Sequence, residues 1–456
     1  MRPGVVSVVP GVIVSAALAT LITSATAAPR LPRIPPAARL EEPCLEGTAP
    51  ACTRRPLDAF TAALSAHRAG TATHPLRVSW FGDSLTADDQ ITHALRTKLA
   101  ALVGDGGPGF LYAVSPHPFN QHRVAARSVT GPWRVHGVSA SPAPDRLLGL
   151  GGSAHLTGEG DGAIRLTAHT PIERVDVHYL AQPHGGALEV VVDGQVVATL
   201  ATAAERKQAM FAPVELPAPA TRVVLRAHGR VRLFGAALER RTGAVVDNLG
   251  VVNATAKQLR TTNLPAHWQN QLAHRAPDLV VLMLGTNEAG WLGAHSTGMA
   301  EHEKLFGELL ASVRSGAPGA SCLVVSPLDQ LDWRLEGMPA RASIPVMVEA
   351  QRRMALAHGC AFWDVYAWMG GEGASKLWFQ RGLVMKDFTH PTAAGATRLG
   401  DALFTALTGA SLQARAGGGE DALGRGELDP QLDGRVVGAA HQLDREHAVP
   451  PARRDQ

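Results

Sequence analysis

The sequence lacks an excess of charge of either sign. Its 43 Lys and Arg residues are almost balanced by 40 Asp and Glu residues, which leaves a formal net charge of +3 over 456 residues. The basic residues are scattered along the chain, whereas nucleic-acid binding depends on basic patches that release counterions from phosphates. We therefore expect no nucleic-acid partner.

Charged residues are too few, and apolar residues too many, for a disordered chain. Hydrophobic residues make up 45% of the sequence and charged residues 18%, which suffices for one large or two medium cores. The 47 glycines and 31 prolines show no tripeptide period, which excludes a collagen-like fibre. A folded globular protein is expected.

Long hydrophobic runs are also missing, apart from one at the N-terminus. Residues 5–22 follow Arg2 and precede Ala25-Thr26-Ala27, the small-x-small pattern of a secretory cleavage site. Pro10 interrupts the run, which argues against the alternative of an uncleaved membrane anchor. We expect residues 1–27 to be a signal peptide, with the mature protein secreted or periplasmic and without stable membrane insertion.

Cysteine is scarce, with four residues in the chain. In an exported protein such cysteines favour disulfides over metal or redox chemistry. Cys44 and Cys52 are close enough in sequence to close a small loop. Cys322 and Cys360 each open an apolar run and would lie side by side on neighbouring parallel strands. These two pairings are our expectation, although four cysteines allow three connectivities.

Two parts of the chain, residues 76–129 and 241–410, alternate strands with helices. The first part opens with the apolar strand 77–81, followed by a helix from Asp88 or Asp89 with apolar residues at helical spacing. The second part has continuous apolar runs typical of buried parallel strands. These runs lie at 244–247, 279–284, 323–326 and 361–365, with helices near 268–274, 301–313, 344–358 and 392–407 between or after them.

Residues 130–240 show a different pattern, with short alternating runs and almost no helical period. Val175, Val177 and Tyr179 alternate with polar residues, and Asp193-Gly194 joins two apolar runs as in a β-hairpin. We expect an inserted, jelly-roll-like β-sandwich of seven or eight strands.

The flanking segments have little apolar content. Residues 28–75 are rich in Pro and Arg with one amphipathic stretch at 57–67, which indicates a leader or linker with a short helix. Residues 411–456 are rich in Gly, Arg and Asp, which predicts a disordered tail.

Four short segments at strand or helix junctions carry residues suited to chemistry. Ser84 follows the first strand in Phe81-Gly82-Asp83-Ser84-Leu85, at the edge where open α/β sheets place their sites. Alone, such a serine is more often a turn or helix N-cap residue. The three further segments are Gly250, Gly285-Thr286-Asn287-Glu288 and Asp387-Phe388-Thr389-His390.

Together and in this order, the four segments resemble the SGNH (GDSL) hydrolase family. The resemblance implies a three-layer α/β/α, flavodoxin-like parallel sheet that is interrupted here by the β-sandwich. It implies Ser84 as nucleophile, His390 as its base and Asp387 as the residue that orients His390. It also implies an oxyanion hole formed by Ser84, Gly250 and Asn287.

The chemistry calls for such a set independently of the resemblance. A serine hydroxyl is a poor nucleophile until a histidine accepts its proton, and that histidine needs a partner on its other ring nitrogen. No metal or organic cofactor is needed, and no pair among the 19 His residues has zinc spacing with a third partner. Asp364 is a rival to Asp387 as the orienting residue.

The resemblance is strongest to exported polysaccharide O-acetylesterases, in particular peptidoglycan O-acetylesterases with a carbohydrate-binding-module-like insert. It implies an enzyme that removes O-acetyl groups from a polysaccharide or a small acyl ester. The alternatives are a polysaccharide O-acetyltransferase, a lipase or acylhydrolase, and a non-catalytic glycan-binding protein. The insert departs from a sugar-stacking module because its aromatic residues are few: Trp133, Tyr179, Phe211 and Phe234.

Overall fold

The computed structural model describes residues 38–48, 50–157, 160–292, 298–332 and 334–409. The expected signal peptide, residues 1–27, and the expected tail, residues 411–456, lie outside the described residues. Among the helices of the described ranges, none combines the length and the apolar character needed to cross a membrane.

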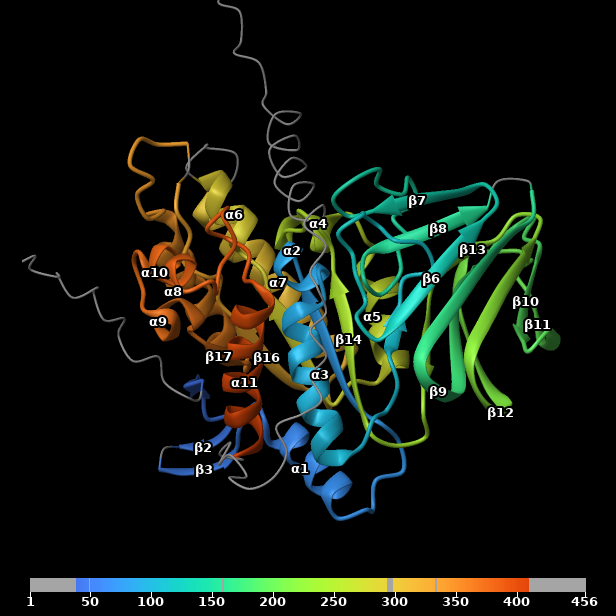
Figure 1. The fold of residues 1–456 in the computed structure, drawn as a ribbon, viewed down its shortest axis with the longest axis horizontal. Coiled ribbons are helices and arrows are strands. Elements are labelled where there is room, and N and C mark those ends of the chain that lie inside the picture. The colour runs from blue at the N-terminus through green and yellow to red at the C-terminus, as the bar shows by residue number, and fades with distance from the viewer. Residues whose placement is uncertain (1–37, 49, 158–159, 293–297, 333, 410–456) are drawn as a thin grey trace, which may run out of the picture. The chain divides into compact units, whose positions relative to one another are not determined.

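A six-stranded sheet forms the centre of the α/β part (Figure 1). Five of its strands run parallel. A short sixth strand at the edge pairs antiparallel with the outermost of these five. In spatial order the strands are β1 (Leu40–Glu41), β17 (Ala361–Trp363), β16 (Ser321–Val325), β15 (Leu279–Met283), β4 (Leu76–Gly82) and β14 (Ala244–Gly250).

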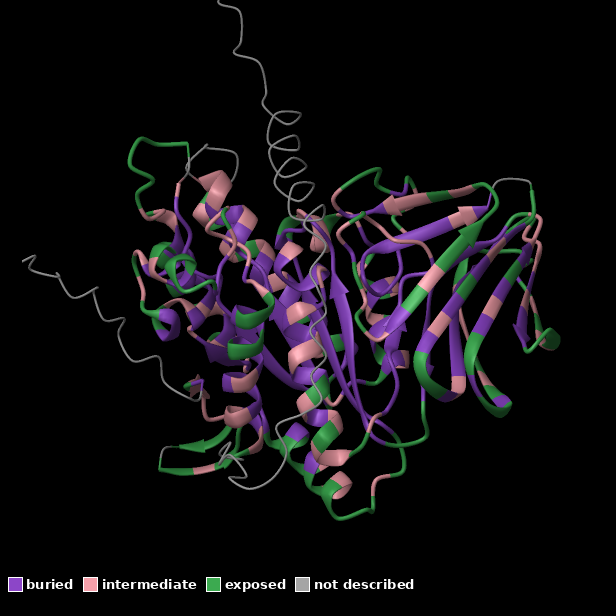
Figure 2. Cartoon of the chain, in the orientation of Figure 1, coloured by how far each residue is buried: buried purple, intermediate pink, exposed green. Residues whose placement is uncertain are grey.

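Both faces of this sheet are covered, as the continuous apolar runs predict (Figure 2). In β15, Val281 and Met283 point into one core, whereas Val280 and Leu282 point into a second core on the opposite face. The predicted three-layer α/β/α class is thereby confirmed.

One core is closed mainly by α1 (Asp58–Arg68), α3 (Gln90–Val103), α9 (Val365–Met369), α10 (Ala374–Gln380) and α11 (Ala393–Thr408). The other core is closed mainly by α4 (Ala256–Thr261), α5 (Pro265–Arg275), α7 (Met299–Gly316) and α8 (Ser343–Ala357). Two shorter helices, α2 (Ser84–Ala87) and α6 (Thr286–Leu292), follow the carboxyl ends of β4 and β15.

A second, antiparallel sheet of nine strands is inserted between α3 and β14. Its hairpin at Asp193-Gly194 has positive φ at both residues, 49° and 80°, as a primed two-residue turn requires. The strands are β5 (Gly109–Leu111), β6 (Ala125–Thr130), β7 (Trp133–Gly137), β8 (Ser153–Thr157), β9 (Gly162–Ala181), β10 (Ala187–Val192), β11 (Gln195–Ala201), β12 (Gln208–His228) and β13 (Arg232–Glu239).

The antiparallel sheet begins earlier than the expected boundary at residue 130. Strands β5 and β6 precede that boundary and pair with β13 and β9. Strand β5 has three residues and lies within a glycine-rich stretch, so its sequence carries no alternation that would mark a strand.

The segment before residue 76 is more than a linker with one helix. Besides α1, it supplies the edge strand β1 to the central sheet and the hairpin of β2 (Glu46–Thr48) and β3 (Ala51–Arg54). The extra strands are two to four residues long, too short to give a readable period.

Both expected disulfides are confirmed. Cys44 is bonded to Cys52 beside the β2–β3 hairpin, and Cys322 is bonded to Cys360 with a Cα–Cα distance of 4.7 Å. The second pair lies on parallel neighbours whose register pairs Leu323 with Ala361, so the preceding residues meet.

A buried network of charges joins the two sheets. Arg275, at the end of α5, is 2% exposed and donates two hydrogen bonds of 2.8 Å to the carboxylate of Asp247 on β14. A further nitrogen of Arg275 donates to Glu239 on β13 at 2.5 Å, and Arg77 on β4 donates twice to the same carboxylate. Glu239 belongs to the antiparallel sheet, so this network links the insert to the central sheet.

We predict that Arg275→Ala lowers the free energy of unfolding by about 3–5 kcal/mol, because it leaves Asp247 and Glu239 buried with one partner fewer. Chemical denaturation measures the change. Arg353→Ala serves as control, since its ion pairs are about half exposed and should be worth about 1 kcal/mol or less. Equal losses in both variants would show that the buried network is not a major source of stability.

Candidate active site

Ser84 lies where the chain leaves β4 and enters α2. Asp83 caps this short helix by accepting a hydrogen bond from the N–H of Leu85 at 2.9 Å. Gly82 permits the tight turn, because a Cβ at this position would lie 2.0 Å from Thr86 Oγ1. The turn leaves Ser84 partly exposed at the carboxyl edge of the sheet.

The turn before α11 brings His390 and Asp387 to the same place. His390 Nε2 lies 2.8 Å from Ser84 Oγ, and His390 Nδ1 lies 2.7 Å from Asp387 Oδ2. The other carboxylate oxygen of Asp387 accepts the backbone N–H groups of Thr389 and His390, each at 3.0 Å. These bonds hold the carboxylate and the imidazole in line with the serine.

The electrostatic surroundings favour a basic His390. Burial by itself lowers its pKa, but the hydrogen bond to Asp387 and the charges of Asp387, Asp88 and Asp83 outweigh burial and raise the pKa above its ordinary value. Burial opposes ionisation of Asp387 too, yet the hydrogen bond and charge of His390 lower its pKa. Asp387 is therefore ionised at neutral pH, as a partner of an imidazolium must be.

Gly250 lies at the end of β14, opposite Gly82 on β4. Its backbone N–H donates to the side-chain oxygen of Asn248 at 3.1 Å, and its carbonyl accepts from Tyr112 and Asn120. The N–H is already engaged, which argues against the expected role of Gly250 as an oxyanion donor. Glycine is instead required here by packing, since a Cβ would lie 2.4 Å from the backbone nitrogen of Ala87.

Three residues further on, Asn253 lies in a turn and has a left-handed backbone conformation. Its φ is +62°, the left-handed region where asparagine is tolerated and glycine favoured. The next residue, Ala254, accepts a hydrogen bond of 3.0 Å from the side-chain amide of Asn287. Asn253 is partly exposed, and no hydrogen bond of its N–H occurs within the described residues.

The buried carboxyl group of Glu288 fixes the backbone next to Asn287. Glu288 is 2% exposed, and its two oxygens accept the N–H groups of Ala256 at 2.8 Å and Gly285 at 3.1 Å. Burial, together with the charge of Asp83, raises the pKa of Glu288 to about 7. The side chain thereby ties the turn before α6, the helix that carries Asn287, to the start of α4, which follows Asn253 in the chain.

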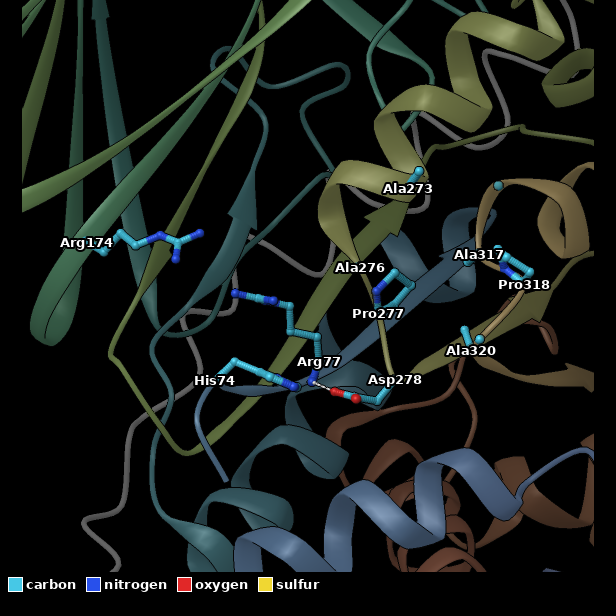
Figure 3. A pocket seen from close by; sticks show the side chains of 12 residues that line it. His74, Arg77, Arg174, Ala273, Ala276, Pro277, Asp278, Ala317, Pro318 and Ala320 are labelled. Carbon is cyan, nitrogen blue, oxygen red and sulfur yellow. Dashed lines mark hydrogen bonds between the residues drawn. The ribbon is translucent and has the colours of Figure 1, made fainter. Parts of the chain in front are cut away.

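Asp364, the rival for orienting His390, has another role. It accepts the N–H of Ala367 at 2.7 Å and so caps α9. A hollow of about 520 Å³ lies elsewhere, at the amino ends of the strands, where the backbone N–H of Arg77 donates to the carboxylate of Asp278 (Figure 3). Ser84 stands at the carboxyl end of β4, so this hollow is not part of the Ser84 site.

A group of potential metal ligands also lies apart from Ser84. Asp176, His178 and His274 each offer a ligand atom within 4.8 Å of the others. The sequence interpretation missed them because His274 is almost a hundred residues from the other two. Only the alternation of Asp176 and His178 on one strand could have hinted at them.

Comparisons with known proteins bear on the whole arrangement. Residues 217–398 match the GDSL-like lipase/acylhydrolase family; this range includes Asn287, Asp387 and His390 but not Ser84. A solved structure of a peptidoglycan O-acetylesterase is 25% identical, with a TM-score of 0.67, over 81% of this chain and 97% of its own.

Other solved structures match shorter parts. LAE5, an alpha/beta hydrolase from the metagenome of Lake Arreo, is 27% identical over 36% of this chain and 73% of its own. Axe2, an acetylxylan esterase from Geobacillus stearothermophilus, is 19% identical over 37% of this chain and 74% of its own. Both have TM-scores of 0.28, too low to support conclusions about this chain. No curated protein matches it in sequence.

We predict that ester hydrolysis is lost on the acid side with an apparent pKa above the ordinary histidine value of about 6.5. The direction follows because protonated His390 cannot accept the Ser84 proton and the carboxylates raise its pKa. The pH profile of kcat/KM for a small acetyl ester measures it. Asp387→Asn should move the limb to lower pH, and an unchanged limb would show that Asp387 does not act on His390.

Proposed function

We propose that this chain, a carboxylic ester hydrolase with a GDSL-like lipase/acylhydrolase domain, removes O-acetyl groups from an envelope polysaccharide, with peptidoglycan as the first candidate. The observation that carries the proposal is the line of hydrogen bonds from Ser84 through His390 to Asp387. The structural likeness to a peptidoglycan O-acetylesterase, which spans both sheets, supports the substrate class.

In the first half of the reaction, Ser84 Oγ attacks the acetyl carbonyl carbon. Its proton passes to His390 Nε2 over the 2.8 Å contact, and Asp387 stabilises the imidazolium that forms. The tetrahedral intermediate then expels the sugar oxygen, which takes the proton from His390. The products of this half are a free sugar hydroxyl and an acetylated Ser84.

Water completes the reaction by the same route. Water attacks the acetyl-serine carbonyl while His390 takes one of its protons. The second tetrahedral intermediate then collapses to acetate as His390 returns the proton to Ser84 Oγ, which regenerates the free serine. An acceptor sugar hydroxyl in place of water would give acetyl transfer. Hydrolysis and transfer therefore share every residue named above and differ in what reaches the acyl-enzyme.

The oxyanion needs preorganised donors in both halves. We assign them to the backbone N–H groups of Ser84 and Asn253 and to the side-chain amide of Asn287. Asn253 replaces Gly250 in this set because the N–H of Gly250 is bonded to Asn248, whereas Asn253 adjoins the residue that Asn287 contacts. Its φ of +62° turns the peptide in a way that ordinary strand residues do not.

We place the reaction outside the cytoplasm. Both disulfides fit a secreted protein, since such bonds persist in oxidising compartments. The expected signal peptide at residues 1–27 and the exposed nature of cell-envelope glycans agree with this location.

We predict that Ser84→Ala abolishes acetate release by a factor on the order of 10⁴ or more while the thermal transition is unchanged. The measurement is acetate released by the purified mature protein from O-acetylated peptidoglycan, O-acetylated xylan and a small acetyl ester. Ser65→Ala is the matched control, because Ser65 lies on the exposed side of α1.

Three outcomes of this assay separate the possibilities. Release from peptidoglycan in excess of xylan supports the proposed substrate. Acetate found only on added oligosaccharide assigns the protein as a transferase, and activity in folded Ser84→Ala would rule out the serine mechanism.

We predict that Asn287→Ala lowers turnover by about 10² to 10³, the usual loss when one oxyanion donor is removed. Asn253→Gly should keep turnover near that of the wild type, because the N–H and the positive φ both remain. Asn253→Val should lose about 10² in kcat, since a β-branched residue resists this φ. If Asn253→Gly loses as much turnover as Asn253→Val, the side chain of Asn253 and not its backbone N–H is the active group.

A further inference from the structure

Strand β9 presents two different faces to its surroundings. Val175, Val177 and Tyr179 point into the core of the antiparallel sheet. The residues between them point the other way, and Leu180 on that face belongs to the core shared with the central sheet. Asp176 and His178 lie on this second face, 3% and 0% exposed.

His274 reaches the same place from α5. Its Nε2 lies 2.7 Å from Asp176 Oδ2, and His178 Nε2 lies 3.6 Å from the same oxygen, which is longer than a hydrogen bond. The ring of Phe211 stacks on His274 with centroids 3.9 Å apart and meets His178 edge-on. Aromatic packing therefore fixes both imidazoles around the carboxylate.

The cluster leaves several buried polar atoms without a partner. Both ring nitrogens of His178 and the Oδ1 atom of Asp176 have no hydrogen-bond partner within the described residues. Such atoms are costly in a protein interior, and an unsatisfied set of this kind is a mark of a bound ion or water.

We propose that Asp176, His178 and His274 bind one divalent transition-metal ion of the zinc class. Two imidazoles and a carboxylate are a ligand set that such ions prefer. Ligand atoms around a tetrahedral ion stand about 3.4 Å apart, given bonds of about 2.1 Å. The 2.7 and 3.6 Å distances bracket that spacing, so small side-chain shifts accommodate the ion.

Solvent access and the local charge agree with this site, because the side chain of His274 is 27% exposed. The hollow at the amino ends of the strands is lined by Arg174 and Ala273, neighbours of the cluster along the chain (Figure 3). Arg174 lies 3.9 Å from Asp176 and is partly exposed, so it can turn into solvent. Arg275, the other nearby cation, is neutralised by Asp247 and Glu239.

The ion joins two parts of the molecule and takes no part in the ester chemistry. Asp176 and His178 belong to the inserted sheet, whereas His274 belongs to a helix that covers the central sheet. Metal binding to the folded chain stabilises it by mass action. The inference is independent of the proposed function, because none of the three residues contacts Ser84, His390 or Asp387 in the described contacts.

Calorimetric titration of the chelator-treated mature chain, without a histidine tag, with Zn²⁺ or Co²⁺ tests the proposal. We expect one ion per chain, a visible Co²⁺ spectrum of low-symmetry coordination that Zn²⁺ abolishes, and a rise in Tm on the order of 2 °C or more. Asp176→Asn and His274→Gln should weaken binding at least about a hundredfold, since losing even outer partners of metal ligands costs 10 to 100-fold.

His267→Gln is the matched control. His267 lies on the same helix, is partly buried and also packs against an aromatic ring, Phe234, but it is outside the cluster. His274→Gln removes a partly exposed side chain, so its fold can be checked by its own thermal transition. We expect His267→Gln to bind Zn²⁺ as tightly as the wild type. The proposal is overturned if His274→Gln also binds that tightly, or if the wild type binds no ion.

Discussion

The buried pairing of Arg275 with Asp247 and Glu239 is the constraint on which the rest of the structure depends. A guanidinium with 2% exposure is tolerable only when carboxylates satisfy it, and here one carboxylate comes from each sheet. Arg77 completes the set from β4, the strand that leads to Ser84. The inserted sheet is therefore attached to the α/β part by more than its two chain connections. Its last strand, β13, supplies the carboxylate of Glu239, which pairs with Arg77 and Arg275 of the α/β part.

The same network holds the strands whose ends form the active site. Asp247 lies three residues before Gly250 on β14, and β14 pairs in parallel register with β4 along all seven of its residues. With β4 and β14 fixed, Ser84 and the turn that contains Asn253 emerge side by side at the carboxyl edge. Only the segment with Asp387 and His390 must then be brought in, and α11 packs closely enough on α3 that a Cβ at Gly400 would lie 2.5 Å from Ala94.

The sequence predicts those parts that rest on local patterns. Ser84, Asp387 and His390 stand at strand or helix junctions, and the resemblance to the SGNH family assigned their shared role. Cys322 and Cys360 open neighbouring strands, so for this pair the position in the alternation was enough. The same reasoning fails where function depends on the direction in which a group points, and not only on its place in the sequence. Gly250 stands at the expected strand end, but its N–H points to Asn248, a fact that depends on one side chain. Asp176 and His178 meet a partner from another element, which no local pattern announces.

The insert is a poor candidate for a removable sugar-binding module. Of the four aromatic side chains at residues 130–240, Tyr179 and Phe234 are buried in the cores, Phe211 stacks on His274, and Trp133 packs against the core of the antiparallel sheet. Among these four, Trp133 and Phe211 keep partial exposure, which leaves little aromatic surface for sugar stacking. Deletion of the sheet would leave Arg77 and Arg275 without Glu239. Because the insert is thus built into the stability of the hydrolase, loss of activity after its deletion would report on folding. Its part in recognising a polymer has to be sought in substitutions of its exposed residues, with the thermal transition measured for each.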